Sequence, residues 1–156
     1  MEDITVFDGD YKFLSNFYFC GVRLNGVTFP SAEHAYQAMK CSDENQRKAF
    51  VHIDSPGRAK RNGRLVDIRP DWEKVKKRVM LAAVMAKFTQ NEDLAVLLTA
   101  TGGRRLVEGN SWHDNYWGSC FCDKCASAAP EVPWPDRGLN YLGQTLMFAR
   151  LAVRPD

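Results

Sequence analysis

The chain has 156 residues, a formal net charge of +2 and an apolar content of 45%. A chain of this length can bury most of the surface that it exposes when unfolded, so it needs no disulfide bonds and is not expected to be disordered. The small net charge argues against broad electrostatic binding to nucleic acid. No apolar run is long enough to cross a membrane, and residues 1–156 are expected to form a single domain.

The N-terminal third carries the pattern of strands. Short β-prone runs at 4–7 and 17–20 predict two of them. Residues 22–24 and 27–29 flank Asn25 and Gly26, a dipeptide that strongly favours a two-residue hairpin turn. The apolar period then changes to that of a helix over 32–41, with Ser31 as its N-cap.

Helices dominate the rest of the chain. They are expected over 42–52, from Pro56, after Pro70 with Asp71 as the cap, after Asn91, and within 138–152, with a short strand at 106–107. Residues 111–137 show no periodicity, and a connection of that length inside one domain is usually functional. Strands followed by a run of helices predict an α+β fold, a helix-rich single domain with a small antiparallel sheet.

The first candidate for chemistry is Glu33, in the first turn of the helix that Ser31 caps. The helix dipole favours a carboxylate there, so Glu33 could equally be a charge that stabilises the helix start. Lys40 lies two turns further along roughly the same face, about 10 Å away by helical rise. It either reaches toward the same pocket or is a surface lysine.

The second candidate is the irregular run 111–118, which contains two tryptophans, a tyrosine, a histidine and Asp114. Aromatic faces stack on nucleobases, and a carboxylate among them could face an electron-poor sugar carbon. Trp117 could instead fill space beneath a loop. Trp72, at the start of the longest predicted helix, is also most simply explained as a core residue.

Basic residues are concentrated between positions 58 and 78. This segment contains nine lysines and arginines but only three acidic residues. Arg58, Lys60 and Arg64 lie near glycines and a turn and could receive a phosphate. A solvated helix face is the alternative, above all for the lysines at 74–77.

Cys120, Cys122 and Cys125 form a CxCxxC pattern. The first ten residues lack a secretory signal, so we expect a cytoplasmic protein whose five cysteines are reduced thiols or metal ligands. The spacing suits thiolate ligation of zinc, and a structural site usually has four ligands. His113, Cys20 or Cys41 could supply the fourth. The cysteines could therefore hold a structural zinc ion or be plain loop thiols, and no cofactor is expected to be required for catalysis.

Several motifs together resemble the NADAR (YbiA-like) superfamily, over roughly residues 13–150. They are FLSNF at 13–17, FPSAEHAYQA at 29–38, DW at 71–72, KFTQN at 87–91, LVE at 106–108, DNYWG at 114–118 and GLNYLG at 138–143. The stretch 119–137 departs from shorter members, in which a brief glycine-rich link takes its place.

The resemblance implies an α+β, helix-rich fold and N-glycosidase activity. Known members act on ribosylamino-pyrimidine phosphates of riboflavin biosynthesis or remove ADP-ribose from guanine. The implied partner is therefore a phosphorylated nucleoside or ADP-ribosylated guanine, including ADP-ribosylated nucleic acid, and no membrane. A module that binds ADP-ribose or a nucleotide without turning it over is the alternative.

The family's functional positions match Glu33, Trp72 and Asp114. We expect Glu33 to stabilise charge or act as a base, and Asp114 to orient substrate or assist proton transfer. Lys40 is an alternative nucleophile. The expected substrate-binding residues are Trp72, Trp117, Asn140, Arg58, Lys60 and Arg64.

Overall fold

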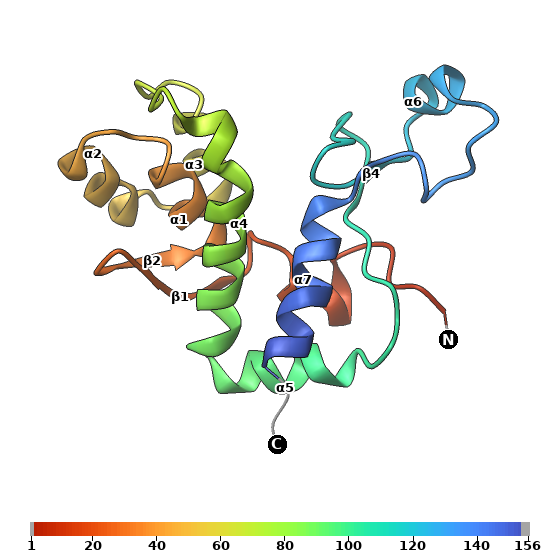
Figure 1. Ribbon diagram of the computed structural model, residues 1–156, viewed down its shortest axis with the longest axis horizontal. Helices are drawn as coiled ribbons and strands as arrows, with labels where there is room; N and C mark the ends of the chain where they lie inside the picture. The colour runs from red at the N-terminus through yellow and green to blue at the C-terminus, as the bar shows by residue number, and fades with distance from the viewer. Residues whose placement is uncertain (1, 154–156) are drawn as a thin grey trace. The chain divides into compact units, whose positions relative to one another are not determined.

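Helices make up most of the regular structure in the computed structural model, which describes residues 2–153 (Figure 1). The chain divides into two compact units. Unit 1 combines Met1–Ser15 with Leu97–Asp156, and unit 2 is Asn16–Val96. The expected α+β class with a small antiparallel sheet is confirmed. The expectation that the chain is a single domain stays a prediction. Within residues 2–153, no helix has both the length and the apolar character needed to cross a bilayer.

The predicted hairpin is present in unit 2. Strand β1 (Phe19–Leu24) pairs antiparallel with β2 (Val27–Ser31). The two turn residues between them, Asn25 and Gly26, have φ values of 49° and 78°, as a type I′ turn requires. Val22 and Phe29 are cross-strand partners and both are fully buried, so one face of the hairpin forms part of the core.

Helix α1 (Ala32–Ala38) begins where β2 ends. The hydroxyl of Ser31 accepts the N–H of His34, which confirms the predicted N-cap. All seven residues of α1 are buried, including three polar ones, Glu33, His34 and Gln37. The long helix α4 (Trp72–Thr89) packs against both α1 and β1.

The remaining helices agree with the sequence in place but differ in detail. The expected helix over 42–52 consists of α2 (Glu44–Ala49) followed by a 3-10 turn, η2 (Phe50–His52). Helices α3 (Pro56–Asn62) and α5 (Glu92–Ala100) follow. Asp71 precedes α4 but caps no backbone N–H. Its carboxylate instead accepts Nε and Nη2 of Arg69 at 2.5 and 2.8 Å. Asp71 therefore occupies the predicted N-cap position, but its side chain makes no cap hydrogen bond.

The end of α4 closes the edge of β1. Gln90 donates its amide to the carbonyl of Arg23 at 3.0 Å and accepts the N–H of Arg23 at 2.8 Å. Asn91 donates to the carbonyl of Gly21 at 2.9 Å. Two side chains thus pair with backbone groups that a neighbouring strand would otherwise take, which protects the edge from pairing with another chain.

The strands of unit 1 lie at other positions than the sequence suggested. The runs at 4–7 and 106–107 contribute one isolated parallel bridge, between Ile4 and Leu106. The regular strands are β3 (Gly109–Asn110) and β4 (Ser119–Cys120), which pair in parallel. The helices of this unit are η1 (Gly9–Leu14), α6 (Asp123–Ala128) and α7 (Tyr141–Ala152).

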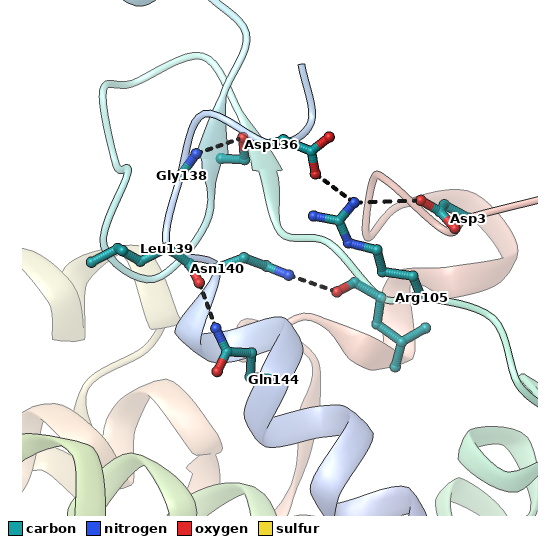
Figure 2. A network of polar contacts seen from close by, with 9 residues as sticks. Asp3, Arg105, Asp136, Gly138, Leu139, Asn140 and Gln144 are labelled. Atoms are coloured by element: carbon teal, nitrogen blue, oxygen red, sulfur yellow. Dashed lines mark hydrogen bonds and ion pairs between the residues drawn. The ribbon is translucent and has the colours of Figure 1, made fainter. Parts of the chain in front are cut away.

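Asn140 fixes the start of α7 in unit 1. It adopts a left-handed conformation with φ of 51° and is buried. Its side chain accepts the N–H of Glu108 at 3.0 Å. It also donates to the carbonyl of Leu106 at 2.8 Å, which is a dashed line in Figure 2. Gly143 permits this approach, because a Cβ there would lie 2.1 Å from the same carbonyl oxygen.

Arg105 ties two further segments of unit 1 together. Its Nη1 lies 2.7 Å from the carboxylate of Asp136 and 3.8 Å from that of Asp3 (Figure 2). One guanidinium therefore connects the N-terminal segment with the residues that lead into α7. All three side chains are partly exposed, so these pairs contribute little to stability, about 0–1 kcal/mol each.

We predict that His34 makes stability depend on pH. Burial lowers the pKa of His34. Its Nε2–H donates to the carbonyl of Ile53 at 3.0 Å, which leaves Nδ1 to accept the hydroxyl of Ser31 at 2.7 Å. The unfolded chain gains a proton as the pH falls below about 6.5, while the folded chain resists it until its own lower pKa is reached. The free energy of unfolding should therefore decrease toward acid, by at most about 1.4 kcal/mol per pH unit.

The measurement is urea unfolding at several pH values between about 5 and 7.5, for the parent and for His34→Gln. The variant should show a shallower slope. His52→Gln, at an exposed position, is the matched control and should leave the slope as it is. Parallel slopes for the parent and His34→Gln would rule out this role.

Candidate functional site

Glu33 is held within unit 2 by one hydrogen bond to its backbone and one to its carboxylate. Only 6% of the residue is exposed. Its backbone N–H donates to the carbonyl of Asn16 at 3.0 Å. One turn further along α1, Gln37 donates its amide to Glu33 Oε1 at 2.7 Å. Gly63 leaves the room that Gln37 needs, because a Cβ at that position would overlap the amide oxygen.

Two aromatic rings and an ammonium group lie next to one another at the C-terminal end of α1. The Nζ of Lys40 is 5.9 Å from the ring centroid of Tyr36 and 5.8 Å from that of Trp72, and the two rings are 5.1 Å apart. These distances are within the range of cation–π attraction. Tyr36 and Trp72 are both 6% exposed. The arrangement joins α1 to the first turn of α4.

Neighbouring charges act on Lys40. Burial lowers its pKa, the carboxylate of Glu33 raises it, and the cations Arg64 and Lys60 lower it further. The net direction is down, so the neutral amine is easier to form than on a surface lysine. The structure thus brings together five of the predicted site residues. They are Glu33, Lys40, Lys60, Arg64 and Trp72, and we call them the Glu33 cluster.

Arg58 has a different environment. It forms an exposed ion pair with Asp54 at 2.7 Å, with the two side chains 62% and 63% exposed. An exposed pair of this kind is worth little energetically and can be broken by a ligand. Phosphate binding by Arg58 stays a prediction.

Three residues beside Glu33 were not singled out from the sequence. Tyr36 and Gln37 stand three and four residues after Glu33, a spacing that places them on its face of the helix, and this signal was available. The third is Asn16. Within residues 2–153, Asn16 Oδ1 and Gln37 Oε1 are buried acceptors without a hydrogen-bond partner. Such groups are rare in folded proteins and suit a ligand that donates hydrogen bonds.

In unit 1, Asp114 organises a tight turn. Its Oδ1 accepts the backbone N–H groups of Tyr116 at 3.0 Å and Trp117 at 2.8 Å. Its own N–H donates to Oδ1 of Asn110, whose Nδ2 donates to the carbonyl of Asp114 at 2.7 Å. The carboxylate is therefore fixed in orientation by its own loop. A catalytic role for Asp114 stays a prediction.

The other two predicted residues of unit 1 lie at this turn or are hydrogen-bonded beside it, since Trp117 is part of the turn and the N–H of Asn140 donates to the carbonyl of Gly118 at 3.2 Å. Trp117 packs edge-on against Tyr116, with ring centroids 4.9 Å apart, and Tyr116 packs against Tyr141 at 4.9 Å. Asn140 uses both ends of its side-chain amide to hold the segment 106–108. Substrate binding by Trp117 and Asn140 is untested, and the structure gives Asn140 a clear positioning task.

Unit 1 contains a cluster of side chains that can hold a metal ion. Its members are His113, Cys120, Cys122 and Cys125, and their ligand atoms all lie within 4.8 Å of one another. Of the three residues considered for a fourth ligand, His113 is the one found beside the thiols. Backbone hydrogen bonding from Cys125 lowers the pKa of the Cys122 thiol.

Comparison with known proteins identifies the family. A model of the NADAR domain matches residues 6–154. The chain belongs to the NADAR family. It is 41% identical over 111 residues to N-glycosidase YbiA of Escherichia coli, which covers 70% of this chain and 69% of that protein. It is also 34% identical over 149 residues to an N-glycosidase of Nostoc punctiforme, covering 92% and 86% of the two chains.

The fold agrees with a solved NADAR relative. The NMR structure of E. coli YbiA matches this chain with a TM-score of 0.77 and 34% sequence identity, covering 98% of this chain and 86% of that one. Membership of the NADAR family and these N-glycosidase relatives make the chain a hydrolase that acts on N-glycosyl bonds.

Asp114 offers a test that separates structure from catalysis in this NADAR protein. Asp114→Asn keeps an Oδ1 that can accept the two backbone N–H groups, whereas Asp114→Ala removes it. We predict that the alanine variant loses about 1–3 kcal/mol of unfolding free energy and that the asparagine variant loses clearly less. If the charge also takes part in the reaction, Asp114→Asn should fold normally and turn over slowly. Full turnover by Asp114→Asn would restrict Asp114 to shaping the loop.

Proposed function

We propose that this NADAR protein hydrolyses the N-glycosidic bond at the ribose of a phosphorylated nucleotide-derived substrate, with Glu33 as the central catalytic group. The single observation that carries the proposal is the buried carboxylate of Glu33, oriented by Gln37 and placed beside the Lys40 ammonium and its two aromatic rings. A charged group held away from water in a defined direction is what stabilisation of a developing charge requires.

The chemistry follows from the bond that is broken. As the C1′–N bond lengthens, positive charge develops on the sugar ring, and a nearby carboxylate stabilises this transition state more than the ground state. A water oxygen then bonds to C1′, Glu33 takes a proton from that water, and the leaving nitrogen keeps the bonding pair and gains a proton. In this proposal Asp114 assists by orienting substrate or moving that proton.

Two features beside Glu33 suit a ribose. The unpartnered acceptors Asn16 Oδ1 and Gln37 Oε1 would receive hydroxyl donors, and the face of Trp72 would stack on a base or sugar. Trp117, in unit 1, is proposed as a second aromatic face for stacking. Lys60 and Arg64, whose charges reach Lys40, would bind the phosphate. The reaction as proposed needs no cofactor. A metal ion in the cysteine–histidine cluster would be structural, because four protein ligands leave no position open for water or substrate.

Two substrate types fit this description. One is ADP-ribosylated guanine, free or in nucleic acid, and the other is a ribosylamino-pyrimidine phosphate. The second is supported by a riboflavin biosynthesis protein of Vibrio vulnificus that is 34% identical over 145 residues, although this chain spans only 36% of that protein. Release of free base, followed by chromatography for each substrate, separates the two.

Glu33→Gln is the central test. The glutamine retains an oxygen that can accept from Gln37 but removes the charge, so the fold should survive and turnover should fall by roughly 10²–10⁴-fold. Glu44→Gln is the matched control in the same unit, because Glu44 is an exposed residue in an ion pair with Lys48. Near-parental turnover by a folded Glu33→Gln protein would contradict the assignment.

Trapping with borohydride distinguishes attack by water, with Glu33 as its base, from attack on the sugar by Lys40. A lysine nucleophile would form a bond from Nζ to C1′ as the base leaves, and the resulting imine of the opened sugar would be trapped by borohydride. Direct attack by water leaves nothing to trap. A mass increase on Lys40 in the presence of substrate and borohydride would therefore favour the lysine, and its absence during rapid turnover would favour water.

We predict that Lys60 and Arg64 bind the phosphate of the substrate. Alanine at either position should raise KM for a phosphorylated substrate by roughly five- to tenfold, with a smaller effect on its dephosphorylated form. Arg61→Ala, at an exposed cation that follows Lys60 on helix α3, is the matched control. If the Lys60 and Arg64 changes raised KM equally for both substrates, these residues would not bind the phosphate and would be ordinary solvent-exposed cations.

A further inference from the structure

The insertion 119–137 buries few apolar side chains that could hold it in one conformation. Helix α6 contains no buried residue. Figure 1 shows α6 within the long connection between β4 and α7. The main ring contact within the insertion is between Phe121 and Trp134, whose centroids are 5.7 Å apart. A segment of this kind needs another source of order, since fixing each residue costs about 1–2 kcal/mol of conformational entropy.

We propose that a zinc ion supplies this order. His113 Nδ1 and the sulfur atoms of Cys120, Cys122 and Cys125 bind it as a four-coordinate structural centre. The ligands come from the loop after β3, from β4 and from the beginning of α6. Zinc therefore joins the insertion to the residue that directly precedes Asp114.

The distances fit one ion. All four ligand atoms lie within 4.8 Å of one another, and His113 Nδ1 is 3.1 Å from the sulfur of Cys122 and 3.5 Å from that of Cys125. In a tetrahedral site with Zn–S bonds of about 2.3 Å, neighbouring ligand atoms are about 3.8 Å apart. Small adjustments of side chains would bring the set to that geometry. Three thiolates and one imidazole are a common zinc ligand set.

Each of the three sulfur atoms also accepts an N–H group. The backbone N–H of Cys122 points to the sulfur of Cys120 at 3.5 Å, and that of Cys125 points to the sulfur of Cys122 at 3.4 Å. The side chain of Asn115 donates to the sulfur of Cys125 at 3.3 Å. Such donors orient metal-bound thiolates and reduce the charge that they carry.

The backbone at His113 is consistent with this arrangement. His113 has φ of 67°, in the left-handed region that few non-glycine residues occupy. It is also exposed, so burial of the ring does not account for the conformation. A strained residue persists where its surroundings fix it. A bond from Nδ1 to zinc would do so, and His113 would then hold the position from which the Asp114 turn starts.

The test begins with the metal content of the full-length protein, purified under reducing conditions without chelators. We expect about one zinc ion per chain by elemental analysis. Cys122→Ser and Cys125→Ser should each weaken zinc binding by more than about 100-fold, measured by competition with a chromogenic chelator, because changes to supporting groups alone cost 10–100-fold. Cys20→Ser, a partly exposed cysteine of unit 2, is the matched control and should bind zinc like the parent.

A second measurement needs no variant. Removal of zinc from the parent protein by a chelator should speed amide hydrogen exchange in 111–137, with exchange in unit 2 unchanged, and returning zinc should reverse the effect. The proposal is overturned if the reduced parent protein lacks zinc and takes up none on addition, if Cys122→Ser binds it as tightly as the parent, or if iron is found in its place. These readouts do not depend on activity, so the zinc site and the glycosidase assignment stand or fall separately.

Discussion

Complete burial of α1 is the constraint on which the rest of unit 2 depends. The helix has seven residues, all buried, and three of them are polar. A buried polar group left without a partner costs about 1–3 kcal/mol, so the surrounding chain has to supply partners. Gln37 faces Glu33, while His34 is bonded at both ring nitrogens. The hairpin, α3 and α4 all pack around this helix. Lys60 and Arg64, proposed to bind the substrate phosphate, lie in α3 and directly after it.

Elements set by short-range rules could be predicted from the sequence. The turn at Asn25 and Gly26, the Ser31 cap and the long helix from Trp72 were all found in place. The side-chain cap predicted for the long helix is missing because its residue has a competing partner. Asp71 stands at a cap position, but the guanidinium of Arg69 offers two hydrogen bonds to the same carboxylate. The β-prone run at 4–7 found one bridge partner in Leu106 and no strand.

The site was predictable to the extent that it lies along one helix. The seven-residue spacing from Glu33 to Lys40 follows from helical geometry. The approach of Trp72, Lys60 and Arg64 to that helix depends on how three helices pack, which no local pattern encodes. For Trp72 the family resemblance supplied what periodicity could not, since periodicity alone favoured an ordinary core residue. Likewise, the cysteine spacing implied a metal site without deciding between His113, Cys20 and Cys41.

The two ends of the insertion lie at one point of unit 1. The N–H of Gly138 donates to the hydroxyl of Ser119 at 3.2 Å, and that of Asn140 donates to the carbonyl of Gly118 at 3.2 Å. Gly138 sits so close that a Cβ there would lie 2.0 Å from the Gly118 carbonyl oxygen. The residues between these ends form a loop that begins and finishes at the same place in unit 1. Each doubling of the length of such a loop adds only about 0.6 kcal/mol to the entropic cost of closing it. The framework can therefore accept segments of different length and composition here, which makes this position the natural place for relatives to diversify without rebuilding α7.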